Sequence, residues 1–284
     1  MPHVRNETVK VMQGNDKHPS SYYVVTAKEM VERPALSGEE RADVCVIGGG
    51  FTGISAALNL AEKGFDVVLL EAERVGYGAS GRCGGLIGSG QRKDVLEMEH
   101  LYGAERSRVL WDFSEAAKEE IRGRVNKHRI QCDLQKGQVV GVHKKSYCDW
   151  PQELADALAE RYDYPHCRAL NASEAREMVA TPTFLGGLWD AEAMTLHPLN
   201  YVLGLARAAS EAGVRIYENS RVRWYTRKDP SEVKTRHGSV RASFVVLACN
   251  GYLGNLERRV AGKIMPINNF MIATEPLGRK RSRE

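Results

Sequence analysis

The clearest chemical signal in the sequence is a set of three glycines followed at a distance by a glutamate. Gly48, Gly50 and Gly53 form the pattern G-x-G-x-x-G, and Glu71 lies 23 positions after Gly48. Glycine at these places permits a tight turn, a close approach of backbone to pyrophosphate, and close packing of a helix on a strand. A carboxylate at this distance can accept hydrogen bonds from a ribose diol and would repel a 2′-phosphate. The pattern predicts a dinucleotide site.

These residues need a strand before the glycines, a helix after them and a second strand before the glutamate. The apolar run 43–47 supplies the first strand, and residues 54–64 repeat apolar side chains at helical spacing. A second apolar run, Val67–Leu70, leads directly to Glu71. This order points the free N–H groups of the helix N-terminus at the phosphates. A glycine-rich turn in another α/β fold is the alternative, and the matching strand, helix and acid favour dinucleotide binding.

A second glycine-rich stretch, Gly76–Gly90, follows Glu71. So many glycines exclude the interior of a helix or strand, so the stretch is a loop. Its place after the predicted ribose-binding strand favours a loop that covers a cofactor over a plain mobile loop. Arg82 is the cation of this loop. It is expected either to meet a pyrophosphate or to be a solvated surface charge, and both interpretations stay open.

Composition excludes several other classes of protein. The 284 residues are 43% hydrophobic and 27% charged, and the net charge of +4 is spread without a basic, aromatic-interleaved strip for nucleic acid. No apolar run approaches the roughly 20 residues of a membrane span, and Met1–Ser20 lacks the apolar core of a signal peptide. The six cysteines show neither C-x-x-C nor metal-site spacing, so we expect no metal and a reducing, cytoplasmic location.

The rest of the chain is predicted to alternate between helices and strands. Helices are expected at 93–129 (divided at Gly103), 149–162, 173–179 and 199–212, and strands at 136–143, 186–190, 214–217, 221–225, 233–236, 244–248 and 264–274. Nucleotide-binding pieces therefore lie at 42–90 and 196–255, with 91–195 as an insertion. We predict an α/β fold: a Rossmann-like domain with an inserted domain of sheet and helices.

Particular side chains in these elements carry their own expectations. Ser173 is expected to cap the helix 173–179, and Ser20–Thr26 to form a short strand or a packed arm. His197 precedes Pro198 and is more typical of a helix cap than of a ligand or base. The long helix is expected to bury an apolar stripe: Val109, Phe113, Ala117 and Ile121.

The run Phe244–Ala248 is continuously apolar, which is typical of a central parallel strand. It ends in a turn of small residues, Cys249-Asn250-Gly251. Because ligands of open α/β sheets bind outside the carboxyl ends of strands, this turn is expected to face the same nucleotide.

Four stretches together carry a resemblance to a known family. They are D-V-C-V-I-G-G-G-F-T-G-I-S-A-A-L-N-L-A-E-K-G-F-D-V-V-L-L-E-A from Asp43, R-V-G-Y-G-A-S-G-R-C-G-G from Arg74, H-P-L-N-Y-V-L-G-L-A-R-A-A from His197, and V-V-L-A-C-N-G-Y-L-G from Val245. The sequence resembles the FAD-dependent oxidoreductases of the D-amino-acid oxidase family, and within it the gamma-glutamylputrescine oxidase group. The resemblance runs from about Ser20 to Leu277.

The resemblance implies FAD as cofactor and an amine or amino-acid substrate. A hydride would pass from a C–H next to the amine to flavin N5, the imine would be hydrolysed, and oxygen would reoxidise the flavin. It implies domains at 42–90 and 196–255 for FAD and at 91–195 and 256–284 for part of the substrate site, after an N-terminal arm at 1–41. The implied substrate pocket lies between the insertion and 264–274, with Pro266–Phe270 near its floor.

The resemblance also implies a set of FAD contacts. Gly48, Gly50, Phe51, Thr52 and Gly53 would hold the pyrophosphate, and Glu71 and Ala72 the adenosine. Val222 would contact the adenine by its backbone. The remaining implied contacts lie along the phosphate and flavin (Ser80, Gly81, Arg82, Gly84, Gly85 and Leu86) or close the nucleotide side (Ala248, Cys249 and Asn250).

Two departures from the family pattern leave alternatives open. Cys83 stands where the group usually has Asn, and nothing after Leu277 resembles the final segment that cradles the isoalloxazine. One alternative is therefore a truncated, catalytically incomplete flavoprotein remnant. A second is an NAD-dependent dehydrogenase, which is less favoured because the loop 76–90 suits the longer contact with FAD. Since flavin carries the redox chemistry, no general base or other catalytic residue is assigned.

Overall fold

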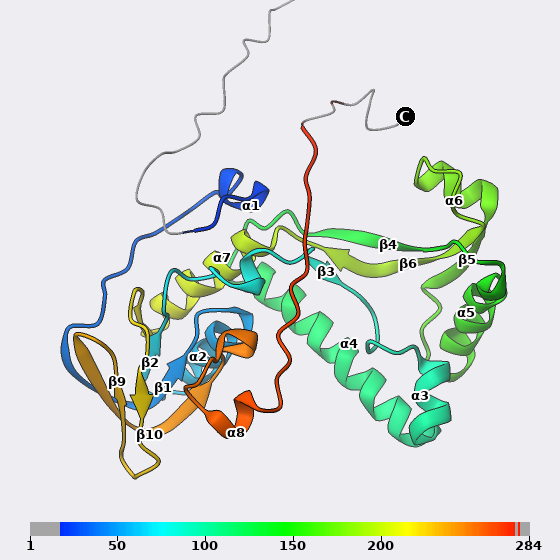
Figure 1. The fold of residues 1–284 in the computed structure, drawn as a ribbon. Helices are drawn as coiled ribbons and strands as arrows, with labels where there is room; N and C mark the ends of the chain where they lie inside the picture. The colour runs from blue at the N-terminus through cyan, green and yellow to red at the C-terminus, as the bar shows by residue number, and fades with distance from the viewer. Residues whose placement is uncertain (1–17, 276–277, 279–284) are drawn as a thin grey trace, which may run out of the picture. The chain divides into compact units, whose positions relative to one another are not determined.

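A computed structural model describes residues 18–275 and residue 278, and it confirms a mixed α/β fold (Figure 1). The described chain forms two compact units. Unit 1 comprises residues 18–82 and 202–268, and unit 2 comprises residues 83–201 and those from 269 onward.

Unit 1 is built on a six-stranded sheet in the order β7-β2-β1-β10-β9-β8. Its first four strands run parallel, and β9 and β8 add antiparallel pairings beside β10. The apolar runs predicted as strands occupy its centre, since Val46 pairs with Leu69 on one side and with Val246 on the other. The strands are β1 (Gly38–Ile47), β2 (Val67–Leu70), β7 (Arg215–Tyr217), β8 (Trp224–Tyr225), β9 (Ser231–Lys234) and β10 (Gly238–Leu247).

Helix α2 (Phe51–Glu62) connects β1 to β2 and packs against both strands (Figure 1). Gly53, Ile54, Ala57 and Leu58 form its buried face, as helical spacing predicts. The predicted βαβ unit is therefore present. Two short helices, α1 (Tyr22–Val25) and α8 (Arg258–Ala261), also belong to this unit, as does most of helix α7 (Pro198–Glu211), described below.

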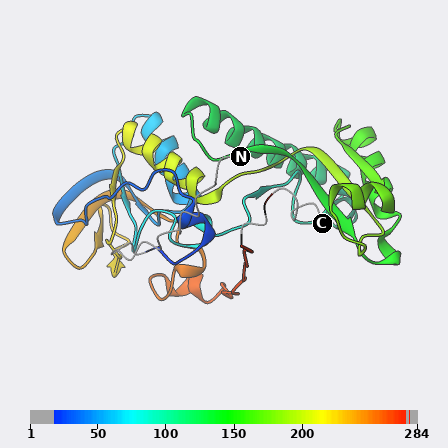
Figure 2. The ribbon, with the colours of Figure 1, turned by 90° about the horizontal axis from the view of Figure 1, so that it is seen from above.

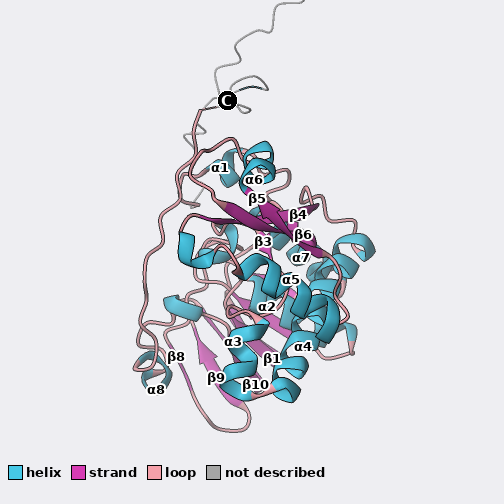
Figure 3. Cartoon of the chain, turned by 90° about the vertical axis from the view of Figure 1, so that its right-hand side faces the viewer, coloured by secondary structure: helices cyan, strands magenta, loops and turns pink. Residues whose placement is uncertain are grey.

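Unit 2 carries an antiparallel sheet in the order β3-β6-β4, with β5 also paired to β6 (Figure 3). Strands β4 and β6 lie side by side along most of their length (Figure 2). The strands are β3 (Leu86–Ile87), β4 (Gln135–Val142), β5 (Cys167–Asn171) and β6 (Gly186–Thr195), and the helices are α3 (Val95–Tyr102), α4 (Ala104–Lys127), α5 (Trp150–Arg161) and α6 (Ala172–Met178). Gly103, with φ 82°, separates α3 from α4, as predicted.

Helix α7 (Pro198–Glu211) confirms the helix predicted at 199–212, and it begins and ends one residue earlier. The buried His197 caps it, because its Nδ1 accepts a hydrogen bond from the Asn200 N–H at 3.1 Å. Leu199, Val202 and Ala206 on its buried face are each at most 1% exposed.

The stretches 18–41 and 256–268 group with unit 1, although the sequence assigned them to an arm and to the substrate domain. Leu36 is 1% exposed in the core, and its N–H donates to Ser220 Oγ at 2.8 Å. Glu257 accepts a hydrogen bond from the Tyr225 hydroxyl at 2.7 Å. These contacts attach both stretches to the six-stranded sheet, and the borders between units fall at 82/83 and 201/202.

The predicted apolar stripe on the long helix is wrong. Val109 and Phe113 are 64% and 72% exposed, and the buried face of α4 instead carries Trp111, Lys118 and Val125. A buried lysine contradicts a pattern drawn from hydrophobicity alone. It is tolerated here because its ammonium group is fully hydrogen-bonded, as described below.

Three smaller expectations are also corrected. Asn171, rather than Ser173, caps α6, because its Oδ1 accepts hydrogen bonds from the Ser173 and Glu174 N–H groups. The Glu174 carboxylate in turn accepts one from the Asn171 N–H. The stretch expected as a strand or arm at 20–26 holds the single helical turn α1. Phe244 lies in a parallel strand as expected but is 64% exposed.

The described residues 264–275 form no strand, contrary to expectation. Met265, Ile267, Phe270 and Ile272 expose 70% or more of their surface, and Pro266–Phe270 line neither cavity described below. A floor of the substrate pocket at this segment stays a prediction.

The two faces of α4 make a direct test of the fold. Trp111→Ala should lower the free energy of unfolding by about 3–5 kcal/mol, because the buried indole packs edge-on against Tyr162 and Tyr164. Phe113→Ala on the same helix should change it by less than about 0.5 kcal/mol, since that ring is exposed. Urea unfolding followed by circular dichroism measures both. Equal losses from the two variants would contradict this assignment of the buried face.

Candidate dinucleotide site

A cavity of about 190 Å³ lies in unit 1 at the carboxyl ends of β1, β2 and β10. This is the edge of an open α/β sheet at which ligands bind. Nine of the residues assigned from the sequence line it: Gly48, Gly50, Glu71, Ala72, Ser80, Val222, Ala248, Cys249 and Asn250. Three stretches far apart in the sequence therefore meet around one cavity, as expected for the turn after β10.

The turn from β1 into α2 has room only for glycine at two of its positions. A Cβ on Gly53 would lie 1.9 Å from the Gly48 carbonyl oxygen, and one on Gly48 would lie 2.6 Å from the Ala248 carbonyl oxygen. Gly48 also has φ +115°, which L side chains rarely adopt. The motif thus brings the N-terminus of α2 close to both parallel strands.

The glycine-rich loop contacts the start of α2. Ser80 Oγ accepts a hydrogen bond from the Phe51 N–H at 3.0 Å, and a Cβ on Gly50 would come within 2.8 Å of that oxygen. The N–H groups of a helix's first turn have no partner within the helix, so they attract a hydroxyl or a phosphate alike. Phe51, Thr52, Gly53, Gly81 and Arg82 belong to the same unit but do not line the cavity.

Glu71 follows β2 directly and lines the cavity. Its Oε2 accepts a hydrogen bond from the Gly49 N–H at 2.6 Å, and its Oε1 accepts one from the Glu73 N–H at 2.9 Å. Burial raises the pKa of the Glu71 carboxyl, and these backbone hydrogen bonds oppose the rise. The carboxylate is thus oriented by the glycine turn itself.

Cys249 stands beside Glu71 at the end of β10. Burial raises the pKa of its thiol, and the negative charge of Glu71 adds to the rise. A thiol kept in its neutral form is a poor nucleophile, so Cys249 contributes shape rather than reactivity to the cavity wall.

A buried acid that the sequence did not single out fixes the loop after Glu71. Glu218 is 1% exposed; its Oε1 accepts a hydrogen bond from the Val75 N–H at 2.8 Å, and its Oε2 lies 2.7 Å from Arg74 Nε. Arg33 Nη1 lies 3.7 Å from Glu218 Oε1. Burial is the main reason that the pKa of Arg33 is lowered. An acid directly after the strand 215–217 was the available signal, but only the fold pairs it with Arg74.

Arg82 meets two aromatic residues that the sequence analysis also missed. Its Nη2 donates to the Tyr252 hydroxyl at 2.8 Å, its Nε donates to the Gly78 carbonyl at 3.3 Å, and its guanidinium lies 5.7 Å from the centre of the Tyr77 ring. Both tyrosines line the cavity. The loop 76–82 is therefore held in unit 1 by polar and ring contacts.

The remaining assigned residues, Gly84, Gly85 and Leu86, belong to unit 2. Gly85 has φ +68°, and a Cβ there would lie 1.9 Å from the Leu196 carbonyl oxygen. The Leu196 N–H donates to the Gly85 carbonyl at 2.9 Å. Glycine is thus needed here for backbone pairing, whatever its role toward a ligand. Leu86 is 63% exposed and Cys83 is partly buried.

Neither a metal cluster nor a membrane-spanning helix occurs in the described part of the chain. Within residues 18–275, no group of three or more His, Cys, Asp or Glu side chains could hold a metal ion. Among the helices of the same residues, none is both long and apolar enough to cross a membrane.

Comparison with known proteins gives a family for this arrangement. The family model DAO, described as FAD dependent oxidoreductase, matches residues 43–284. The match continues past Leu277, so the predicted end of the resemblance at Leu277 is corrected.

Curated relatives are similar along most of the chain. A "Probable oxidoreductase OrdL" of Rhizobium meliloti is 38% identical over 258 residues, which are 90% of this chain and 60% of that protein. "Gamma-glutamylputrescine oxidoreductase" of Escherichia coli is 37% identical over 269 residues, which are 94% of this chain and 63% of that protein. The chain therefore spans about three-fifths of the length of these relatives.

Solved structures share the fold. L-amino acid deaminase from Proteus myxofaciens has a TM-score of 0.67 and 26% identity, over 85% of this chain and 52% of that chain. Glycine oxidase from Geobacillus kaustophilus has a TM-score of 0.61 and 25% identity, over 78% of this chain and 58% of that chain.

Two helical glycines test the close approach in the motif. Gly53→Ala should lower the free energy of unfolding by about 1–3 kcal/mol, because its Cβ meets the Gly48 carbonyl. Gly123→Ala, in the middle of α4 with nothing within 4 Å of the new Cβ, should instead raise it by about 0.5–1 kcal/mol. Thermal and urea unfolding give both values. A Gly53→Ala variant with an unchanged free energy of unfolding would show that α2 and the turn are not in contact.

Proposed function

The chain belongs to the family of FAD dependent oxidoreductases, and from this membership we propose that it binds FAD and oxidises an amine or amino-acid substrate. The observation that carries the proposal is the cavity of unit 1. There the glycine turn, Glu71 and the turn after β10 meet at the carboxyl edge of the sheet.

The cavity fits the adenosine and pyrophosphate part of FAD. The residues of the turn around Gly48 are glycines, so no Cβ blocks the approach of a pyrophosphate to the backbone beside the N-terminus of α2. Glu71 and Val222 both line the cavity. The Glu71 carboxylate would accept hydrogen bonds from a ribose diol, and Val222 would lie beside the adenine. The N–H of Phe51 donates to Ser80 Oγ and would have to exchange that partner to bind a phosphate oxygen.

The proposed contacts extend from this cavity along the glycine-rich loop. Ser80 and Gly81 would follow the phosphates, and Arg82 would supply a cation held ready by Tyr252. Gly84, Gly85 and Leu86 would meet the flavin. We assign no catalytic acid or base to the described residues, because flavin supplies the redox chemistry and the protein binds and orients its substrate.

Bound FAD would supply the redox chemistry of the proposed reaction: it would take a hydride at N5 from the carbon beside the amine nitrogen, water would hydrolyse the imine, and oxygen would reoxidise the cofactor to give hydrogen peroxide. A gamma-glutamylputrescine-like amine is the proposed substrate. The support is the 37% identity to the Escherichia coli oxidoreductase of that name, together with the fold shared with glycine oxidase and L-amino acid deaminase. Each of these three names specifies a small substrate that contains nitrogen.

A cytoplasmic location is part of the proposal. The six cysteines lie within the described residues as free thiols, from buried Cys45 to exposed Cys148. Free thiols are typical of a reducing compartment.

FAD binding is tested by titration of the purified chain. FAD at 100 times its dissociation constant should raise the free energy of unfolding by about 2.7 kcal/mol, with flavin absorbance near ~450 nm retained after desalting. NADH binding more tightly than FAD would instead support a dehydrogenase. No flavin retained after reconstitution would contradict the proposal.

Glu71→Gln should weaken FAD binding by roughly tenfold or more, because an amide replaces the charged acceptor and can no longer hold both the Gly49 and Glu73 N–H groups. Glu211→Gln, at the exposed end of α7, is the matched control and should leave FAD affinity unchanged. Fluorescence quenching of FAD measures both. Equal affinities for the two variants would remove Glu71 from the proposed site.

The reaction itself is tested without oxygen. Gamma-glutamylputrescine added to the FAD-loaded chain should bleach the flavin absorbance, and admission of air should restore it with formation of peroxide. Bound flavin that no amine or amino acid bleaches would favour the catalytically incomplete alternative.

A further inference from the structure

Unit 2 contains a cavity of its own, of about 430 Å³. Residues of the loop 88–95, of β4, of α5 and of β6 line it, and none of them lines the cavity of unit 1. Its volume lies within the range of small-molecule sites, and the proposed reaction makes no use of it.

Most of this cavity wall is apolar. Trp111, Leu154, Leu158 and Leu188 line it and belong to a cluster of buried side chains. The second indole in the wall, Trp150, is held in place because its Nε1 donates to Asp94 Oδ2 at 2.7 Å. Such walls suit an aliphatic chain, and the indole faces of a site of this kind can also attract a cation.

Three carboxylates line the cavity, and Asp190 on β6 is the one bound by Tyr164. Asp190 Oδ1 accepts hydrogen bonds from the Tyr164 hydroxyl at 2.7 Å and from the N–H groups of Glu192 and Ala193 at 3.0 and 3.1 Å. These three donors fix the orientation of the carboxylate. Among the described residues, none donates a hydrogen bond to Asp190 Oδ2, so one oxygen stays available to a ligand.

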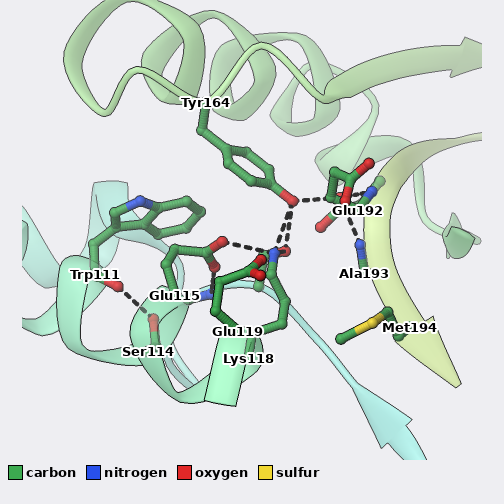
Figure 4. A network of polar contacts seen from close by, with 12 residues as sticks. Trp111, Ser114, Glu115, Lys118, Glu119, Tyr164, Glu192, Ala193 and Met194 are labelled. Carbon is green, nitrogen blue, oxygen red and sulfur yellow. Dashed lines mark hydrogen bonds and ion pairs between the residues drawn. The ribbon is translucent and has the colours of Figure 1, made fainter. Parts of the chain in front are cut away.

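Behind this carboxylate lies a network built around an ammonium group (Figure 4). Lys118 is 2% exposed; its Nζ lies 2.6 Å from Glu115, 2.7 Å from Ser89 Oγ and 3.1 Å from the Tyr164 hydroxyl. It also lies 4.8 Å from the centre of the Tyr164 ring. The surroundings of Tyr164 therefore already stabilise one primary ammonium group away from water.

The hydrogen bonds of this network run in one direction. Because Tyr164 donates its hydrogen to Asp190, Ser89 is the donor in its 2.8 Å contact with Tyr164 and the acceptor from Lys118. The chain from Lys118 through Ser89 and Tyr164 ends at Asp190, on the cavity wall. One cation faces two carboxylates, Glu115 and Asp190, so a negative charge is left over at the cavity.

Other charged groups at the cavity do not reverse this balance. Lys93 pairs with Glu97, and Asp94 lies between the cap of α3 and Trp150. Arg92 is exposed on the loop. Burial chiefly, with the charge of Asp190, raises the pKa of Cys167 to about 12, so this neighbouring thiol adds no charge.

We propose that the cavity of unit 2 binds a protonated aliphatic primary amine, with its ammonium group on Asp190 and its chain against Trp111 and the leucines of α5. An anion is disfavoured because it would meet Asp190 and Asp94. A neutral chain would fill the apolar wall but leave the oriented carboxylate without a cation. This site is separate from the proposed FAD cavity and does not depend on flavin binding.

The probe is 1-aminobutane at neutral pH, where it is protonated, titrated into the full chain by calorimetry with tryptophan fluorescence as a second signal. We expect saturable binding, and binding of 1-butanol and of butyrate that is weaker by about tenfold or more. Equal affinity for the alcohol, or preference for butyrate, would overturn the proposal, as would the absence of saturable amine binding. The titration is done without FAD and repeated with it.

Asp190→Asn should weaken amine binding by roughly 10–100-fold, because the charge is lost while Oδ1 can still accept from Tyr164. Asp156→Asn, on the exposed face of α5, also removes one negative charge from unit 2 and should leave the amine affinity unchanged. Gln138→Trp is a second variant, which fills the cavity but keeps Asp190 and should also abolish binding. Amine affinity unchanged in both cavity variants would place the amine elsewhere.

Discussion

The close approach of the glycine turn to its neighbours is the constraint on which unit 1 depends. Where Gly53 passes the Gly48 carbonyl, and Gly48 passes the Ala248 carbonyl, the space for any Cβ is already taken by backbone. This contact sets the distance between α2, β1 and β10 together. It also decides where the free N–H groups of α2 lie, because a helix displaced by one side chain would no longer present them at the sheet edge. The position of Glu71 follows, since the Gly49 N–H holds its carboxylate.

Long-range polar contacts then fix the segment that the glycine turn cannot reach. The loop after Glu71 is bound by Glu218, 143 positions from Val75 in sequence, and Arg82 is bound by Tyr252, 170 positions away. Buried carboxylates are costly unless they are paired and hydrogen-bonded, and Glu218 meets both conditions with Arg74 and the Val75 N–H. The cavity wall therefore combines a local motif with contact residues that lie far later in the sequence.

The sequence could predict the features that depend on contacts between nearby residues, but not those that depend on residues far apart in the chain. The βαβ unit, the break at Gly103 and the His197 cap were predictable because spacing, glycine and proline act within a few residues. Glu218, Tyr77 and Tyr252 were not, because each acts on a residue that only the folded sheet brings near. The buried face of α4 was predicted wrongly for a related reason: hydrophobicity favoured Phe113, whereas hydrogen bonds from other elements make Lys118 the buried residue. Residues 264–275 were predicted as a strand from their apolar side chains, but they pair with no neighbouring strand, and an apolar pattern alone does not show whether such a partner exists.

The two cavities offer opposite chemistry, and this contrast gives each unit its own selectivity. In unit 1, glycine backbone and a helix N-terminus present N–H donors, which favour the anionic phosphates of a dinucleotide. In unit 2, hydrogen bonds that start at Lys118 end on Asp190, so the cavity presents a carboxylate among indoles and leucines. An anionic cofactor would thus be disfavoured in the cavity of unit 2 by the charge of Asp190. Because no residue lines both cavities, a change in one can be made without altering the contacts of the other.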